Sequence, residues 1–385
     1  MEINQKQFWR NINTIILAFP FLMKSCSVDS IHPPQELLPS PSTITIARPS
    51  FNLPGNWQKE GKSRELKSPS VTDNEVVWGI SRDTFILNNN EGVYKTLDNG
   101  EHWKKIEVAQ TIGINHLGMI NTDSGIGVLK PLANTKGAVL TNITKITYSI
   151  DQGKSWITRK LSTALAQGGI TASSKNQMWA WGERLYFSSD RGVKWIDVFD
   201  NLKRNFPQRN YDTHQYIKSF LDVGYRVICL TTDGNIYSSA NLGASWERHA
   251  PPSIPPIGFM ENVRMITDKD NNLWIAFNTD SREGIYSGIQ KINNENQISL
   301  PNMNVKDVIF LSNGKIVICG SLSPFALHLS LKTDRLGFIM VSPDLGKNWQ
   351  VEYLNPDVSS INSISVVGST VFGVGDKGIV VKLSF

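Results

Sequence analysis

The stretch VSPDLGKNWQ, from Val341 to Gln350, repeats the pattern of KTLDNGEHWK, from Lys95 to Lys104. Both contain a hydroxyl residue, an acid two positions later, a glycine two positions after that, and then a tryptophan. This skeleton, Ser/Thr-x-Asp-x-Gly-x-x-Trp, occurs four times, and a fifth copy has asparagine in place of aspartate. The copies are Thr96-Asp98-Gly100-Trp103, Ser149-Asp151-Gly153-Trp156, Ser188-Asp190-Gly192-Trp195, Ser239-Asn241-Gly243-Trp246 and Ser342-Asp344-Gly346-Trp349.

These residue types predict a tight β-hairpin. The side chains of Ser, Thr and Asp accept hydrogen bonds from backbone N–H groups of their own turn. Glycine adopts a backbone conformation that other residues resist, and the tryptophan begins the next strand and covers apolar surface beside the turn. Because all four roles are structural, we interpret the aspartates as turn-forming residues, and not as acids or metal ligands.

The spacing indicates a repeat architecture. Successive tryptophans of the motif are separated by 53, 39, 51 and 103 residues, and the last gap suggests a unit that lacks the signature. The motif resembles the Asp-box, or BNR, repeat of sialidases, sortilin-type receptors, some glucan hydrolases and photosystem II assembly factors. The resemblance implies a β-propeller in which each box connects the third and fourth strands of a blade.

The runs between the boxes predict how the propeller closes. Short apolar runs parted by turn residues surround each box, and only three strands follow the last one. The missing fourth strand is expected at the start of the domain, because NWQKE at Asn56–Glu60 matches NWQVE at Asn348–Glu352. We therefore predict an all-β, seven-bladed propeller of four-stranded blades over residues 56–385. Its N-terminal strand pairs with the C-terminal blade, which removes exposed sheet edges.

The N-terminus predicts export. Residues 1–25 combine a basic start with the apolar run INTIILAFPFLM, which is typical of a signal peptide. The sequence FLMKSC resembles a bacterial lipoprotein signal, which implies lipidation of Cys26; a soluble exported protein or an uncleaved anchor are the alternatives. Residues 26–55 contain six prolines and predict an extended tether. We expect a cell-envelope protein held at a membrane by its N-terminal lipid.

The net charge, the cysteines and the lack of catalytic motifs limit the classes of partner and of chemistry that the sequence predicts. The 385 residues carry a net charge of +5, too weak and dispersed to predict nucleic-acid binding. Cys229 and Cys319 lie in apolar runs and are expected in the core. No nucleophile elbow, paired zinc histidines or phosphate loop occurs in the sequence. We therefore expect no catalytic residues, no cofactor and no metal, and a monomeric state.

Two classes of function remain open. A sialidase-like glycoside hydrolase needs three arginines, a tyrosine–glutamate pair and an acidic proton donor, but only Arg226 and Arg264 stand at suitable strand-like positions, and no third arginine is evident. The favoured alternative is a non-enzymatic binding or assembly protein, similar in plan to the photosystem II assembly factors. Its partner would be a protein or a glycan of the envelope.

The longest insertions suggest where a partner binds. By the topology that the resemblance implies, they lie opposite the boxes, and loops carry binding more often than strands do. We expect partner binding by two groups of basic and aromatic residues, although solvated variable loops are the alternative. The first group is Lys203, Arg204, Arg209, Tyr211 and His214, and the second is Phe325, His328, Lys332 and Arg335.

Overall fold

The structure is a computed structural model that divides into two units, the second of which covers residues 45–385. All described residues belong to the second unit. They are residues 50–52, 63–66, 69, 74–81, 84–89, 91–106, 116–120, 125–131, 142–149, 157–166, 169–172, 177–190, 192–205, 216–232, 234–249, 260–281, 284–292, 297–301, 303–322 and 335–385. Cys26 and the predicted signal peptide therefore lie outside the described residues.

Three antiparallel sheets have four strands each, connected in chain order. The first contains β3 (Asn74–Ser81), β4 (Thr84–Asn89), β5 (Gly92–Thr96) and β6 (Lys104–Ile106). The second contains β15 (Ile217–Asp222), β16 (Val227–Thr231), β17 (Ile236–Ser239) and β18 (Glu247–His249). The third contains β19 (Met260–Thr267), β20 (Leu273–Ser281), β21 (Gly284–Lys291) and β22 (Gln297–Pro301).

A fourth sheet has eight strands and combines two such units. The first unit contains β7 (His116–Ile120), β8 (Gly125–Pro131), β9 (Asn142–Ser149) and β10 (Ile157–Ala166). The second contains β11 (Gly169–Ala172), β12 (Met178–Trp181), β13 (Leu185–Ser188) and β14 (Ile196–Asp197). Their first strands pair in parallel through Ala172 and Ile120. Seven separate blades were predicted, whereas the structure contains six sheets. The number is lower because the inner edges of two neighbouring units come close enough for their backbones to pair.

The last two sheets include strands from the start of the domain. One contains β23 (Met303–Phe310), β24 (Ile316–Leu322), β25 (Leu336–Ser342), β26 (Asn348–Asn355) and the added strand β1 (Ser50–Asn52), which runs parallel to β26. The other contains β27 (Ile361–Val367), β28 (Thr370–Gly375), β29 (Val380–Ser384) and β2 (Ser63–Leu66), with the 3-10 helix η4 (Asp376–Gly378) before β29. Strand β1 falls within the stretch that was predicted as a tether.

An N-terminal strand pairs with the C-terminal blade, as predicted, but it is a different strand. Strand β2 lies antiparallel to β29, with Ser63 opposite Leu383 and Leu66 opposite Val380. The expected strand, Asn56–Glu60, lies outside the described residues. The sequence SREL fits the edge of this sheet because Leu66 is buried. Arg64 and Glu65 form hydrogen bonds with Glu101 and Tyr353 of the neighbouring sheets.

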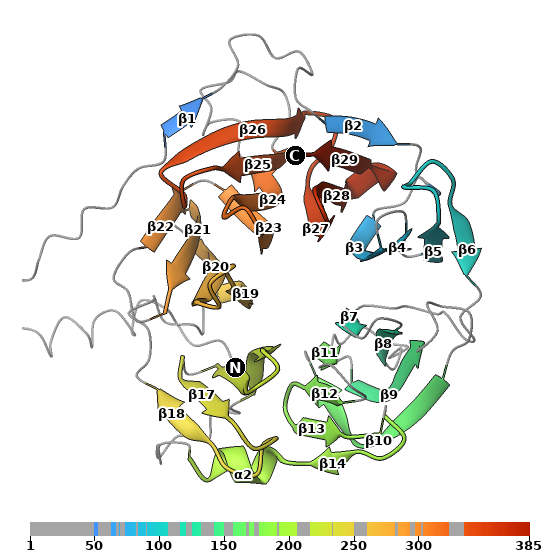
Figure 1. Ribbon diagram of the computed structural model, residues 1–385, viewed down its shortest axis with the longest axis vertical. Coiled ribbons are helices and arrows are strands. Elements are labelled where there is room, and N and C mark those ends of the chain that lie inside the picture. The colour runs from blue at the N-terminus through green and yellow to red at the C-terminus, as the bar shows by residue number, and fades with distance from the viewer. Residues whose placement is uncertain are drawn as a thin grey trace, which may run out of the picture. The chain divides into compact units, whose positions relative to one another are not determined.

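The sheets are arranged around a common centre, as in a β-propeller (Figure 1). First strands such as β3, β19, β23 and β27 lie nearest the centre, and fourth strands such as β6, β18, β22 and β26 lie outermost. Aromatic pairs hold neighbouring sheets together, because offset or tilted ring contacts add to the burial of apolar surface. The ring centroids of Phe85 and Phe372 are 3.9 Å apart, and those of Trp179 and Phe220 are 5.1 Å apart.

Two cysteines, Cys229 and Cys319, lie in the hydrophobic core. Cys229 and Cys319 are free and fully buried, as the sequence predicts. Burial raises the pKa of the Cys319 thiol well above its usual value, which keeps it protonated. Among the residues that the structure describes, no helix has the length and hydropathy needed to span a bilayer.

Candidate functional site

The Asp-box turns share one hydrogen-bond pattern. In the last box, the N–H of Gly346 donates to Ser342 Oγ over 2.7 Å, and Ser342 Oγ donates to Asp344 Oδ1 over 3.0 Å. The N–H of Asn348 donates to the same carboxylate over 2.8 Å. The boxes that begin at Thr96, Ser188 and Ser239 repeat these three bonds over 2.7–2.9 Å. In the remaining box only Ser149 is described, at the end of β9.

The box carboxylates are committed to their turns. The backbone N–H of His102, with the Thr96 hydroxyl, lowers the pKa of Asp98 to about 2. The backbone N–H of Lys194 likewise lowers the pKa of Asp190. Asn241 accepts the equivalent hydrogen bond from the N–H of Ser245 over 2.9 Å, so an amide can replace the acid. Because an amide oxygen fills the same role as the carboxylate oxygen, the side chain at this position serves as a hydrogen-bond acceptor for the turn. It is not needed there as a proton donor.

The box glycines fix each blade to its neighbour. Gly346 has φ +85°, and a Cβ there would lie 2.6 Å from Cδ1 of Ile298, in the preceding sheet. Gly100 has φ +89°, and a Cβ there would lie 2.6 Å from Cδ1 of Leu66 and 2.9 Å from Phe372. Glycine is therefore needed at these turns for both conformation and space.

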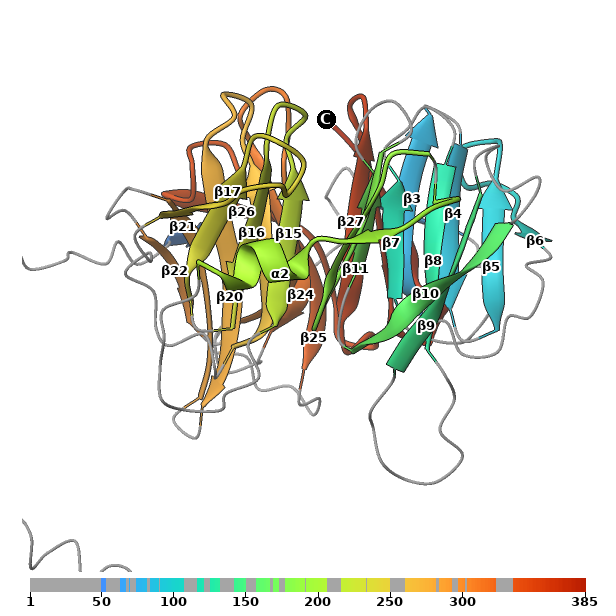
Figure 2. The same cartoon turned by 90° about the horizontal axis from the view of Figure 1, so that it is seen from below.

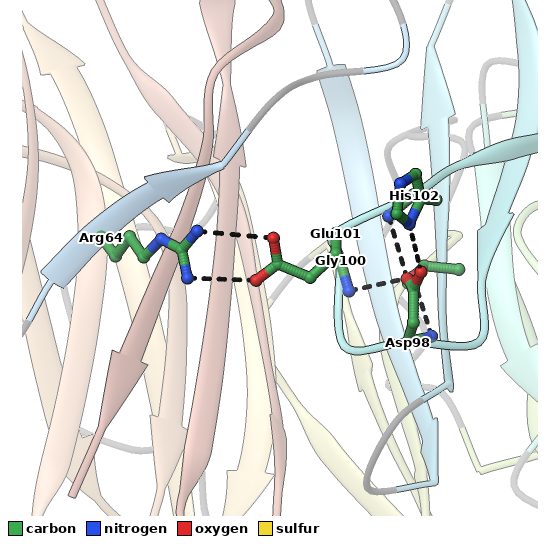
Figure 3. A network of polar contacts seen from close by, with 6 residues as sticks. Arg64, Asp98, Gly100, Glu101 and His102 are labelled. Carbon is green, nitrogen blue, oxygen red and sulfur yellow. Dashed lines mark hydrogen bonds and ion pairs between the residues drawn. The ribbon is translucent and has the colours of Figure 1, made fainter.

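The first box also contacts the closing strand (Figure 3). Arg64 of β2 donates from both terminal nitrogens to the Glu101 carboxylate, over 3.1 and 3.4 Å. In the same turn His102 Nδ1 lies 2.7 Å from Asp98 Oδ2. On its other side, β2 reaches the sheet of β23–β26, where Tyr353 donates to Glu65 over 3.1 Å. Strand β2 thus joins three sheets at the point where the ring closes.

All described boxes lie at one end of the sheets, which we call the box face. First strands β7 and β11 are parallel, and the N–H groups of Val77 and Gly79 in β3 donate to Ser363 and Ser365 in β27, two residues apart in both strands. Neighbouring first strands therefore run in the same direction, and the turns between third and fourth strands fall at the same end. Figure 2 shows the sheets from the side, with the strands running between the two ends.

The opposite end carries an irregularity that repeats from sheet to sheet. Near the start of five first strands, one extra residue interrupts the pairing with the second strand. The extra residues are Glu75, Lys218, Glu261, Lys306 and Asn362. We call this end the bulge face. Bulges re-aim side chains and are over-represented beside functional sites, and here they place polar residues around the centre of the ring.

The residues after the bulges link the first strands of neighbouring sheets. Ser219 Oγ accepts a hydrogen bond from the N–H of Met265 over 2.9 Å. Asp307 is buried, accepts from the N–H of Ile364 over 3.0 Å, and forms an ion pair with Arg264. Such acceptors satisfy backbone N–H groups on the first strands β19, β27 and β3, and the Arg264–Asp307 ion pair joins β19 to β23. Five successive sheets are thereby joined by polar contacts around the centre.

The predicted partner-binding residues are only partly described. Arg209, Tyr211, His214, Phe325, His328 and Lys332 lie outside the described residues. Lys203 and Arg204 are exposed at the end of α2 (Phe199–Lys203). Asn201 of α2 donates to the Gly243 carbonyl, so this connection starts beside the next box and not on the opposite face. Val198, directly before α2, also lies beside this box, because a Cβ on Gly243 would be 3.1 Å from its side chain.

Arg335, in contrast, lies on the bulge face. It precedes Leu336, which pairs with Leu322, and Leu322 pairs with Met303 at the start of β23. Exposed Arg335 and half-buried Lys306 therefore occupy the same end of one sheet. On the sheet of β15–β18, the ammonium of Lys218 lies 5.6 Å from the centre of the Tyr216 ring. Arg335 and Lys306 thus lie on one sheet of the bulge face, and the pair of Lys218 and Tyr216 lies on another.

Sequence reasoning missed the bulge residues, although a signal was present. The runs YIKSFLDV, VKDVIFL and INSISVV each place two polar residues side by side inside an apolar strand. Strict alternation would allow only one. The second polar residue faces the neighbouring sheet, and the first is the bulge.

Arg226 and Arg264, the arginines considered for a sialidase, make separate contacts. Arg264 pairs with Asp307, and Arg226 lies over the ring of Tyr225 in its own hairpin. The described residues contain no cluster that could hold a metal ion.

This arrangement defines a β-propeller with two distinct faces, and known structures have the same fold. No protein-family model matches the sequence, and no curated protein is significantly similar to it. A structure described as YCF48 bound to D1 peptide is 14% identical, with a TM-score of 0.56, over 88% of this chain and 99% of its own. YCF48 from Cyanidioschyzon merolae is 18% identical, with a TM-score of 0.54, over 84% and 98%.

A third structure, the GH74 enzyme of Niastella koreensis, is 12% identical with a TM-score of 0.57. The match covers 83% of this chain and 53% of that enzyme, so this chain spans about half of it. At such identities the similarity establishes the fold alone.

Proposed function

We propose that this protein is a non-enzymatic binding or assembly protein that holds a segment of a partner protein on its bulge face. The observation that carries the proposal is the recurrence of one bulge at the same place in five first strands. A bulge interrupts the pairing of a sheet and re-aims the side chains beside it, and here the same irregularity recurs at one end of five sheets. It surrounds the centre of that face with polar residues, two of which are lysines.

Three further points support this reading. Arg335 lies on the same face, and the chain between Leu322 and Arg335 starts and ends there. The box carboxylates are occupied by their own turns, which argues against their use as acids. The similar structure described as YCF48 bound to D1 peptide is a propeller that holds a peptide, and we propose the same class of partner here.

The finer organisation is also part of the proposal. We count the eight-stranded sheet as two blades, which makes seven, because each half repeats the four-stranded meander of the other sheets. We further propose that the protein is exported to a bacterial cell envelope and held at a membrane by a lipid on Cys26. Retention of a radiolabelled fatty acid by the natural chain, and its loss in Cys26→Ser, would test the anchor.

Site-specific photocrosslinking in cells tests the binding face. A photoreactive amino acid is placed at Lys306 or Arg335 on the bulge face, and at Glu247 as a control on the outermost strand β18. All three positions are at least partly exposed. We expect one discrete adduct from the two bulge-face positions, containing a polypeptide that mass spectrometry identifies, and none from Glu247. Equal adducts at all three positions, or none at Lys306 and Arg335, would refute the placement.

A further inference from the structure

The exposed apolar side chains of the domain gather on the box face. Six large hydrophobic residues of the described chain are more than 40% exposed: Leu97 (68%), Val193 (61%), Ile196 (56%), Tyr225 (63%), Leu242 (42%) and Leu345 (51%). Four of them lie within box turns, and Ile196 directly follows a box tryptophan. Tyr225 lies between β15 and β16, two residues before Val227, which pairs with the first residue of the fourth box, Ser239.

Folding does not require leucine at these tips. Leu242 and Leu345 have φ +57°, a left-handed conformation that disfavours residues with a Cβ. The first box has Asn99 at the equivalent position, with φ +63°, and asparagine tolerates this conformation well. Leucine there is neither buried nor conformationally favoured. Such a conflict between local preference and the residue present is typical of a functional position.

The distribution of the tips favours a flat partner. They project from the sheets of β3–β6, β11–β14, β15–β18 and β23–β26, which are spread around the centre (Figure 1). A bound peptide would follow one groove and reach only neighbouring tips, whereas a bilayer surface meets all of them together. The exposed tip charges have both signs, as in Glu101, Lys194 and Lys347, so contact would depend on apolar insertion more than on anionic lipid.

The direction of β1 supports the same orientation. Strand β1 is parallel to β26, with Ser50 opposite Asn348 and Asn52 opposite Gln350. Asn348 is the sixth residue after Ser342 and belongs to the last box. Ser50, the first described residue, therefore lies at the box face.

We propose that the box face is a membrane-contacting surface, whose apolar tips insert into the headgroup region of a bilayer and leave the bulge face directed away from it. The inference rests on the proposed membrane tether for its orientation, but the tips make contacts of their own. Exposed hydrophobic residues on one face are a recognised mark of membrane interaction, and burial of their apolar surface supplies the attraction.

An environment-sensitive fluorophore tests the insertion in the full chain. In a Cys26→Ser background, Leu242→Cys, Leu345→Cys and the control Arg335→Cys are each labelled with NBD. Native Cys229 and Cys319 are fully buried and do not compete. With vesicles of phosphatidylethanolamine and phosphatidylglycerol, we expect a blue shift, about a twofold rise in emission and quenching by brominated lipid at both leucine positions. The label at Arg335 should show none of these changes.

Sedimentation with the same vesicles separates this inference from the tether. These variants lack the Cys26 lipid, so protein that shows no change at Leu242 or Leu345 would overturn the box-face contact, whereas the fatty-acid labelling tests the tether separately. Equal changes at Arg335 would overturn it as well. A variant with Leu97→Asn, Leu242→Asn and Leu345→Asn should remain folded, because asparagine suits the left-handed conformation of Leu242 and Leu345 and because Leu97 is 68% exposed. We expect it to bind vesicles about tenfold or more weakly, since each leucine gains free energy on leaving water.

Discussion

Replacing Gly346 with alanine should separate the two reasons for a glycine in the box. The residue has φ +85°, and an added Cβ would lie 2.6–2.8 Å from three carbons of Ile298 in the neighbouring sheet. The left-handed conformation costs a residue with a Cβ about 1–2 kcal/mol, and overpacking of a filled site costs about 1–3 kcal/mol. We therefore expect Gly346→Ala to lower the free energy of unfolding by about 2–5 kcal/mol.

Gly224 supplies the matched control. Its φ is +86°, and a Cβ there would meet nothing within 4 Å. Gly224→Ala should therefore cost only the conformational part, about 1–2 kcal/mol. The two variants and the wild type are compared by urea unfolding, followed by tryptophan fluorescence. Equal losses of stability in the two variants would refute the claim that the box glycine locks one blade against the next.

Three further predictions concern the same turns and the closing strand. Because the Asp98 pKa is lowered to about 2 from 3.8, its ionisation stabilises the fold above pH 3.8, and that stability is lost as the pH falls toward 2. Asp98→Asn should behave as wild type at pH 7 and unfold less steeply between pH 4 and 2, measured by circular dichroism; an unchanged acid transition would contradict this. Leu345→Asn should keep or raise stability by up to about 1 kcal/mol in urea unfolding, whereas a clear loss would show that Leu345 packs in the fold. Arg64→Ala should lower the free energy of unfolding by less than about 1 kcal/mol, since the ion pair with Glu101 is exposed. Leu66→Ala should lower it by about 2–5 kcal/mol, because Leu66 is buried. A larger loss for Arg64→Ala than for Leu66→Ala in urea unfolding would contradict the view that burial of Leu66 holds the closing strand.

The features that sequence predicted are those that depend on local chemistry. Each box spans eight residues, and its hydrogen bonds connect groups at most four residues apart, so the residue types alone define the turn. The apolar runs around the boxes became strands for a similar reason, since β-branched and aromatic residues suit a buried sheet. The burial of Cys229 and Cys319 followed from the same runs.

The features that sequence missed depend on the neighbouring blade. The likeness of NWQKE to NWQVE did not point to Ser63–Leu66, the strand that pairs with β29, because that choice depends on what Leu66, Arg64 and Glu65 contact in the two sheets beside their own. The bulges were missed because the polar residue after each one, such as Ser219 or Asp307, has its partner in the next sheet. The position of α2 was missed because it depends on a contact between Asn201 and the Gly243 carbonyl.

The pairing of β2 with β29 has a consequence for how the protein is made. Ser63 emerges from the ribosome more than 300 residues before its partner Leu383. The circle of blades stays incomplete until nearly the whole polypeptide exists, and contacts so distant in sequence slow folding. A product truncated before residue 380 would leave β2 without its pairing strand and expose the edge of β28 to aggregation.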